Sequence, residues 1–113
     1  MPGNQPMLPP SVSDPVLRHF RTVLDRLYGD RLERAMLFGS RARGDARMDS
    51  DYDIAIFLRD YRGLWDEAGP LADVTTEILY DTGAVLTPIP FPAGAYSERT
   101  ALMNEIRREG IEL

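Results

Sequence analysis

The sequence predicts an α/β fold of the two-layer α+β kind, in which a small mixed β-sheet is covered by helices. A chain of 113 residues has room for one compact core. Apolar residues recur at helical spacing in three segments, and three short apolar runs bounded by glycine or proline have the length of strands. The resulting order of helix, strand, strand, helix, strand, helix favours a mixed sheet with helices packed on it.

The beginning of the chain divides into two parts. Residues 1–12 are rich in proline and lack periodicity, so we expect a flexible leader, followed by one domain over residues 13–113. Ser13 can cap a helix whose first turn contains Asp14 and Pro15. Apolar positions then recur on one face, which predicts an amphipathic helix that ends near Gly29.

Three apolar runs are predicted to form the sheet. The first, residues 35–38, is stopped by Gly39, and the second, residues 52–58, is the most strand-like run in the chain. The third, residues 84–89, contains a proline, which places it at an edge of the sheet or near its own end.

Two further helices follow from the same reasoning. We expect the main body of a helix over residues 70–80, because Gly69 and Pro70 interrupt the pattern or delay its start. A last helix is predicted over residues 97–109. The apolar residues at the end of the chain are expected to close the core of the domain, with docking on a partner as the alternative.

Composition excludes several classes of protein. No apolar run is long enough to cross a bilayer, and the N-terminus lacks the pattern of a secretory signal, so we expect a cytoplasmic protein. A net charge of −5 argues against a protein that coats nucleic acid. Without cysteine and with one histidine, His19, any bound metal must be held by oxygen ligands.

Asp51 and Asp53 are the strongest candidates for metal ligands. They stand two positions apart at the entrance of the second predicted strand, so their side chains point to the same face of the sheet. The two negative charges repel one another, and the apolar strand that follows offers little water to relieve the conflict. Mg²⁺ suits such a pair, because it is usually held by one or two carboxylates together with substrate phosphates.

A phosphate-binding turn is predicted directly upstream. Gly39 and Ser40 lie where the first strand gives way to a turn or a short helix, so backbone N–H groups there can face an anion. Glycine permits close approach of the backbone, the Ser40 hydroxyl can donate a hydrogen bond, and Arg41 and Arg43 add positive charge. The alternative is a solvated loop in which these arginines balance nearby aspartates.

The stretch LFGSRARGDARMDSDYDIAIFL combines both parts. It resembles the minimal nucleotidyltransferases of the polymerase-beta-like superfamily, which are often antitoxins beside a HEPN-domain toxin. The resemblance implies the polymerase-beta-like nucleotidyltransferase fold, with Gly39, Ser40, Arg41 and Arg43 at the nucleotide and Asp51 and Asp53 as catalytic Mg²⁺ ligands. It also implies transfer of AMP from ATP to an acceptor hydroxyl, here on a partner protein such as a HEPN-type toxin.

One part of the superfamily pattern is missing. Its members commonly carry a third carboxylate on the next strand, whereas residues 84–89 contain no acid, and only the more distant Asp73, Glu77 and Asp81 remain as candidates. This departure motivates a second hypothesis, a non-catalytic nucleotide-binding module that neutralises its partner by contact. A nucleic-acid-binding regulator is a third interpretation, which the net charge disfavours.

Two conspicuous side chains outside this stretch are assigned no functional role. His19 is expected to be structural or exposed at the surface. Trp65 is expected to pack at the start of a helix, with a contact to a partner as the alternative.

Overall fold

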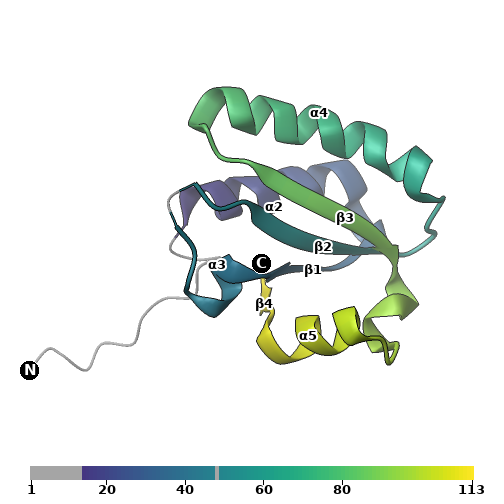
Figure 1. Ribbon diagram of the computed structural model, residues 1–113. Coiled ribbons are helices and arrows are strands. Elements are labelled where there is room, and N and C mark those ends of the chain that lie inside the picture. The colour runs from purple at the N-terminus through teal and green to yellow at the C-terminus, as the bar shows by residue number, and fades with distance from the viewer. Residues whose placement is uncertain (1–13, 48) are drawn as a thin grey trace, which may run out of the picture.

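A computed structural model describes residues 14–47 and 49–113, and it contains a four-stranded mixed sheet flanked by helices (Figure 1). The strand order is β3-β2-β1-β4, with β1 antiparallel to both β2 and β4, and β2 parallel to β3. The strands are β1 (Leu32–Phe38), β2 (Tyr52–Leu58), β3 (Leu86–Pro92) and β4 (Ile111–Glu112). The mixed sheet predicted from the sequence is confirmed.

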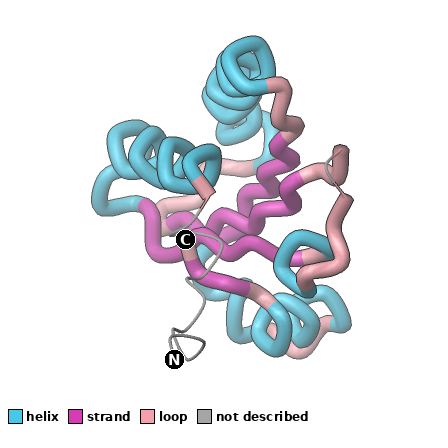
Figure 2. Tube along the Cα trace, turned by 90° about the vertical axis from the view of Figure 1, so that its left-hand side faces the viewer, coloured by secondary structure: helices cyan, strands magenta, loops and turns pink. Residues whose placement is uncertain are grey.

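Helices lie on both faces of this sheet (Figure 2). One face packs against the two long helices, and the other is partly covered by the last helix and the 3-10 turn before it. The predicted two layers are therefore the sheet and the long helices, and the last helix adds partial cover on the second face. The helices are α2 (Pro15–Tyr28), α3 (Ser40–Arg43), α4 (Leu64–Thr82) and α5 (Ala101–Glu109), with 3-10 turns at Gly29–Arg31 and Ala93–Ser97.

Asp14, rather than Ser13, caps α2. Its Oδ1 accepts a hydrogen bond of 2.8 Å from the Val16 N–H, while Ser13 and the predicted leader lie outside the described residues. Oδ2 of Asp14 accepts a second hydrogen bond of 2.6 Å from the hydroxyl of Tyr52. A single carboxylate therefore fixes both the start of α2 and the start of β2, next to the predicted metal ligands.

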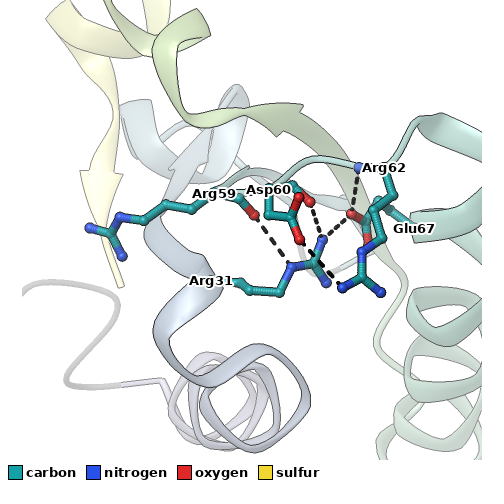
Figure 3. A network of polar contacts seen from close by, with 5 residues as sticks. All are labelled: Arg31, Arg59, Asp60, Arg62 and Glu67. Carbon is teal, nitrogen blue, oxygen red and sulfur yellow. Dashed lines mark hydrogen bonds and ion pairs between the residues drawn. The ribbon is translucent and has the colours of Figure 1, made fainter.

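Helix α4 starts earlier than its sequence predicts, because a tertiary contact outweighs the proline inside it. Pro70 lacks an N–H group and normally costs a helix interior about 3 kcal/mol. The carboxylate of Glu67 nevertheless holds the first turn of α4, since it accepts the Arg62 N–H at 3.1 Å and pairs with the guanidinium of Arg31 (Figure 3). Residues 70–80 are helical, as predicted for the main body, but the helix begins at Leu64 and continues through Pro70 without the expected interruption or late start.

Strand β3 is an edge strand that is protected against pairing. The N–H of Tyr52 donates to the carbonyl of Val85 at 2.9 Å, so in the alternating parallel ladder the N–H groups of Thr87, Ile89 and Phe91 face β2. The outward positions are occupied by the proline residues Pro88, Pro90 and Pro92, which have no N–H to offer another strand. The predicted edge position is confirmed, although the strand starts at Leu86 rather than Ala84.

The C-terminal part of the chain also differs from its prediction in detail. Residues 93–97 form a 3-10 turn, and α5 starts at Ala101, where the Thr100 hydroxyl accepts the Met103 N–H at 3.1 Å. The last residues form β4 beside β1, and Leu113 packs on the core. The expected closure of the core is confirmed. Among the residues described, no helix is both long and apolar enough to span a membrane.

Candidate active site

The two aspartates lie at the start of β2, on the face of the sheet that α5 partly covers. Tyr52 and Ile54 pack into the core beneath α2 and α4, whereas Ala55 packs into the second core beneath α5. By the alternation of a strand, Asp53 shares the face of Ala55, and Asp51 before it points the same way. Asp53 is half-buried and Asp51 is exposed. The structure thus brings the two carboxylates together as predicted.

Gly39 is required by geometry at the end of β1, where Phe38 pairs with Asp53. Its φ of +75° lies in the region that glycine favours. A Cβ atom at position 39 would also lie 2.5 Å from Oδ2 of Asp53, which is too close for any other residue without movement. The Gly-Ser turn and the aspartate pair are therefore in direct contact and form one site.

Ser40 opens α3, the short helix that the sequence suggested. This helix is a single turn in which the N–H groups of Ala42 and Arg43 both donate to the carbonyl of Gly39 at 3.1 Å. Gly44 ends the turn in the left-handed conformation. This turn redirects the chain from β1 into the loop that leads to Asp51.

Arg43 lies close to Asp53. The pKa of Asp53 is raised by burial and by the charge of Asp51, and the positive charge of Arg43 partly opposes this rise. The same guanidinium pairs with Glu109 of α5 at 3.7 Å and with Asp45 at 3.5 Å. It is therefore shared among several acids and does not neutralise Asp53 alone.

Arg41 occupies a different environment. Its Nε donates to the carbonyl of Ser50 at 2.9 Å, and its guanidinium lies 3.9 Å from the centre of the Tyr52 ring. Burial, followed by the hydrogen bond to Asp14, raises the pKa of Tyr52 to about 12, so the ring that Arg41 covers stays neutral. A hollow of about 320 Å³ beside Arg41 and Tyr52 is also lined by Ser50 and Thr82. The contacts of Arg41 hold the loop, and its role at the nucleotide stays a prediction.

The carboxylate of Asp53 carries an electrostatic conflict. Its pKa is raised above the usual range, first by burial and then by the charge of Asp51, with a further contribution from Glu105. Arg43 opposes this shift without cancelling it. A site that leaves negative charge uncompensated is suited to a cation.

The position expected for a third carboxylate is occupied by Thr87, which is the partner of Asp53 on β3. The sequence-based candidates Asp73, Glu77 and Asp81 all lie on α4, which covers the opposite face of the sheet, so they are wrong as ligands. Besides Asp51, the acid whose charge acts on Asp53 is Glu105 of α5, which the sequence reasoning missed. Only the path of the chain from β3 through the 3-10 turn shows that α5 returns to this face.

The donor set fits magnesium held jointly with a substrate. In residues 14–47 and 49–113, no three side chains of histidine, cysteine, aspartate or glutamate are placed to hold a metal by themselves. Asp51 and Asp53 would supply two oxygen ligands, and phosphate oxygens and water would complete the shell, which is the usual arrangement for Mg²⁺.

Comparison with known proteins agrees with this geometry. Residues 24–113 match the family model "Polymerase beta, Nucleotidyltransferase". The chain is similar to a Methanocaldococcus jannaschii protein named "Putative protein adenylyltransferase MJ0141", with 24% identity over 98 residues that span 87% of this chain and 95% of that protein.

Solved structures give the same result for the fold. A protein described as a "putative minimal nucleotidyltransferase" is 28% identical, with a TM-score of 0.55 over 86% of this chain and 92% of that one. A chain of a toxin–antitoxin structure with AMP-PNP is 20% identical, with a TM-score of 0.56 over 83% of this chain and 69% of that one. Together with the Gly-Ser turn in contact with the aspartate pair, the match over residues 24–113 shows that this chain belongs to the polymerase beta nucleotidyltransferase family.

Proposed function

We propose that this chain transfers AMP from ATP to a hydroxyl group on a partner protein in the presence of Mg²⁺, and that it acts as the antitoxin of a HEPN-type toxin. The observation that carries the proposal is the close approach of Gly39 to the carboxylate of Asp53, because it supports a phosphate-binding turn next to the proposed metal ligands. The name of the archaeal relative and the toxin–antitoxin structure with AMP-PNP support a protein acceptor and an adenine nucleotide.

The reaction requires the residues of this site to hold a triphosphate and an acceptor in line. The acceptor oxygen forms a bond to the α-phosphorus, the bond from that phosphorus to the oxygen bridging to the β-phosphate breaks, and pyrophosphate leaves. Gly39 and Ser40 are proposed to position the phosphates, and Arg43 to balance charge on the leaving group. Magnesium bound to Asp51 and Asp53 would supply stabilisation of the negative charge that develops in the transition state.

Thr87 offers no carboxylate on β3 to accept the proton of the acceptor hydroxyl, and that proton is proposed to pass to water or to a group of the partner. The same residue favours a second candidate function, in which the chain binds nucleotide but neutralises its partner by contact alone. In that case the aspartate pair would serve nucleotide binding and not transfer.

The test begins with calorimetric titration of the chain with ATP and Mg²⁺. We expect magnesium-dependent binding that is lost in the Asp51→Asn, Asp53→Asn double variant. Asp49→Asn is the matched control, since it removes an exposed aspartate from the same loop. Equal binding by all three proteins, or binding by none, would contradict the nucleotide site.

Transfer is measured next, with ATP labelled at the α-phosphate and a HEPN-type protein as acceptor. Label on the acceptor with the natural chain and the Asp49→Asn control, but not with the double variant, is the expected result. If the chain binds nucleotide and neutralises the HEPN-type protein but transfers no label to it, the contact-only module is the better account of its function.

A further inference from the structure

The outward surface of α4 exposes large apolar side chains that the fold does not use. Trp65 is 88% exposed and Tyr80 is 85% exposed, while Leu64 and Leu79 are 50% and 44% exposed. The expectation that Trp65 packs at the helix start is therefore wrong. Helix α4 lies along one side of the molecule with the sheet beneath it, and none of the elements formed by residues 14–47 and 49–113 lies on its outer side (Figure 1). Exposed aromatic and aliphatic side chains gathered on one element are characteristic of interaction surfaces.

The two aromatic residues belong to one stripe. At about 100° and 1.5 Å per residue, Trp65 and Tyr80 are separated by about 60° around the helix and by about 22 Å along it. The positions between them on the same side are exposed, small and uncharged. We call this surface the α4 stripe; it comprises Trp65, Gly69, Ala72, Thr76, Leu79 and Tyr80. The aromatic side chains thus lie at the two ends of a surface whose middle positions are small and uncharged.

A hollow lies beside the stripe, between α4 and the edge strand β3. It has a volume of about 270 Å³, and its lining includes Ala72 and Thr75 of α4 and Leu86 and Pro88 of β3. Because prolines remove the outward N–H groups of β3, a partner cannot add a strand efficiently at this edge. The surface is better suited to side chains presented by a helix.

The charge of α4 defines the partner further. The helix carries five acids and neither lysine nor arginine. Glu67 is paired with Arg31, and the four acids that remain exposed lie along one flank of the stripe: Asp66, Asp73, Glu77 and Asp81. A ligand that fits this surface combines an apolar centre with a row of positive charge on one side.

We propose that the α4 stripe docks an amphipathic helix of a partner protein that carries arginine or lysine along one edge of its apolar face. Tyrosine and tryptophan are common energetic centres of protein interfaces, and Trp65 and Tyr80 would contribute most of the binding. The surface is independent of the nucleotide site, because α4 covers the face of the sheet opposite Asp53. A partner held there leaves the carboxylates open.

Trp65 is the single tryptophan of the chain, so its fluorescence reports directly on the stripe. The probe is a synthetic amphipathic helix of leucine and arginine, and the control peptide has glutamate in place of arginine. We expect saturable binding of the first peptide with a blue shift of Trp65 emission, and no shift with the second. Binding of both peptides alike would contradict the proposal.

Variants localise the binding. The Leu79→Ala, Tyr80→Ala pair and the Asp73→Asn, Glu77→Gln pair are each expected to raise the Kd by about tenfold or more. The Glu33→Gln, Glu98→Gln pair removes the same charge from exposed positions outside α4 and should leave the Kd unchanged. Equal Kd values for all variants would overturn the proposal. A shift in Trp65 emission with protein concentration, accompanied by dimers in sedimentation, would assign the stripe to a second copy of this chain instead.

Discussion

At each end of strand β2 a carboxylate lies near an arginine. The negative charge is compensated at one end and left uncompensated at the other. Near the end of β2 lies Glu67 of helix α4, whose side chain is only 5% exposed. Its carboxylate pairs with Arg31 and accepts a hydrogen bond from the Arg62 N–H (Figure 3). At the start of β2, the carboxylates of Asp51 and Asp53 repel each other, and the cation that acts on Asp53, Arg43, is shared with Glu109 and Asp45.

This difference distinguishes a carboxylate that stabilises the fold from a carboxylate that is suited to binding a ligand. A buried carboxylate whose partners lie within the chain holds elements together and needs nothing else. A carboxylate whose charge is left in conflict costs stability in the free protein and is satisfied when a cation binds. This contrast supports a structural role for Glu67 near the end of β2, and it supports the ligand-binding role that we propose for Asp53 at its start.

The largest effect on stability is expected from Glu67→Gln. Loss of the charge leaves Arg31 without its carboxylate, and we expect the free energy of unfolding to fall by about 3 kcal/mol, at the lower end for a broken buried pair because Arg31 keeps its carbonyl partners. Urea unfolding measures this loss. Glu77→Gln, an exposed acid on the same helix, should change it by less than about 0.5 kcal/mol. Equal effects of the two substitutions would contradict the structural role of Glu67.

The second effect concerns the functional end of the strand. Gly39→Ala forces a Cβ against Asp53 at a positive φ, so we expect a loss of about 2 kcal/mol in stability together with loss of ATP and Mg²⁺ binding in calorimetry. Gly44→Ala is the matched control, because its φ is +84° but the space around it is open. It should cost about 1 kcal/mol and leave binding unchanged. Loss of binding in both variants would show that turn conformation matters and contact with Asp53 does not.

Much of this site could be predicted from the sequence because its geometry is local. Strand alternation is enough to place Asp51 and Asp53 on one face, and a glycine at the end of an apolar run is enough to place the turn. The second strand has the bounds predicted for it, residues 52–58. In these segments the local pattern and the tertiary structure agree.

The remaining features depend on long-range contacts that a local pattern does not contain. Helix α4 passes through Pro70 because Glu67, in its first turn, is held by Arg31, which directly precedes β1 in the chain. Glu105 reaches the site because the 3-10 turn Ala93–Ser97 directs α5 back across the second face. The exposure of Trp65 likewise follows from which side of α4 meets the sheet.

The smallest effect tests the cost of the unsatisfied charge itself. Because the folded pKa of Asp53 is raised, the folded protein binds a proton more tightly than the unfolded chain, and its stability falls as the pH rises from the usual aspartate range through the raised pKa. Asparagine does not titrate, so Asp53→Asn should stabilise the metal-free protein near neutral pH by at most about 1 kcal/mol, because water screens this partly exposed carboxylate. The advantage should disappear at about pH 3, where Asp53 is protonated in both states. Urea unfolding at the two pH values measures the difference, and Mg²⁺ with ATP should reverse its sign by stabilising only the natural chain. If Asp53→Asn is less stable at neutral pH in metal-free buffer, then Asp53 supports the fold as Glu67 does, and the contrast between the two ends of β2 is lost.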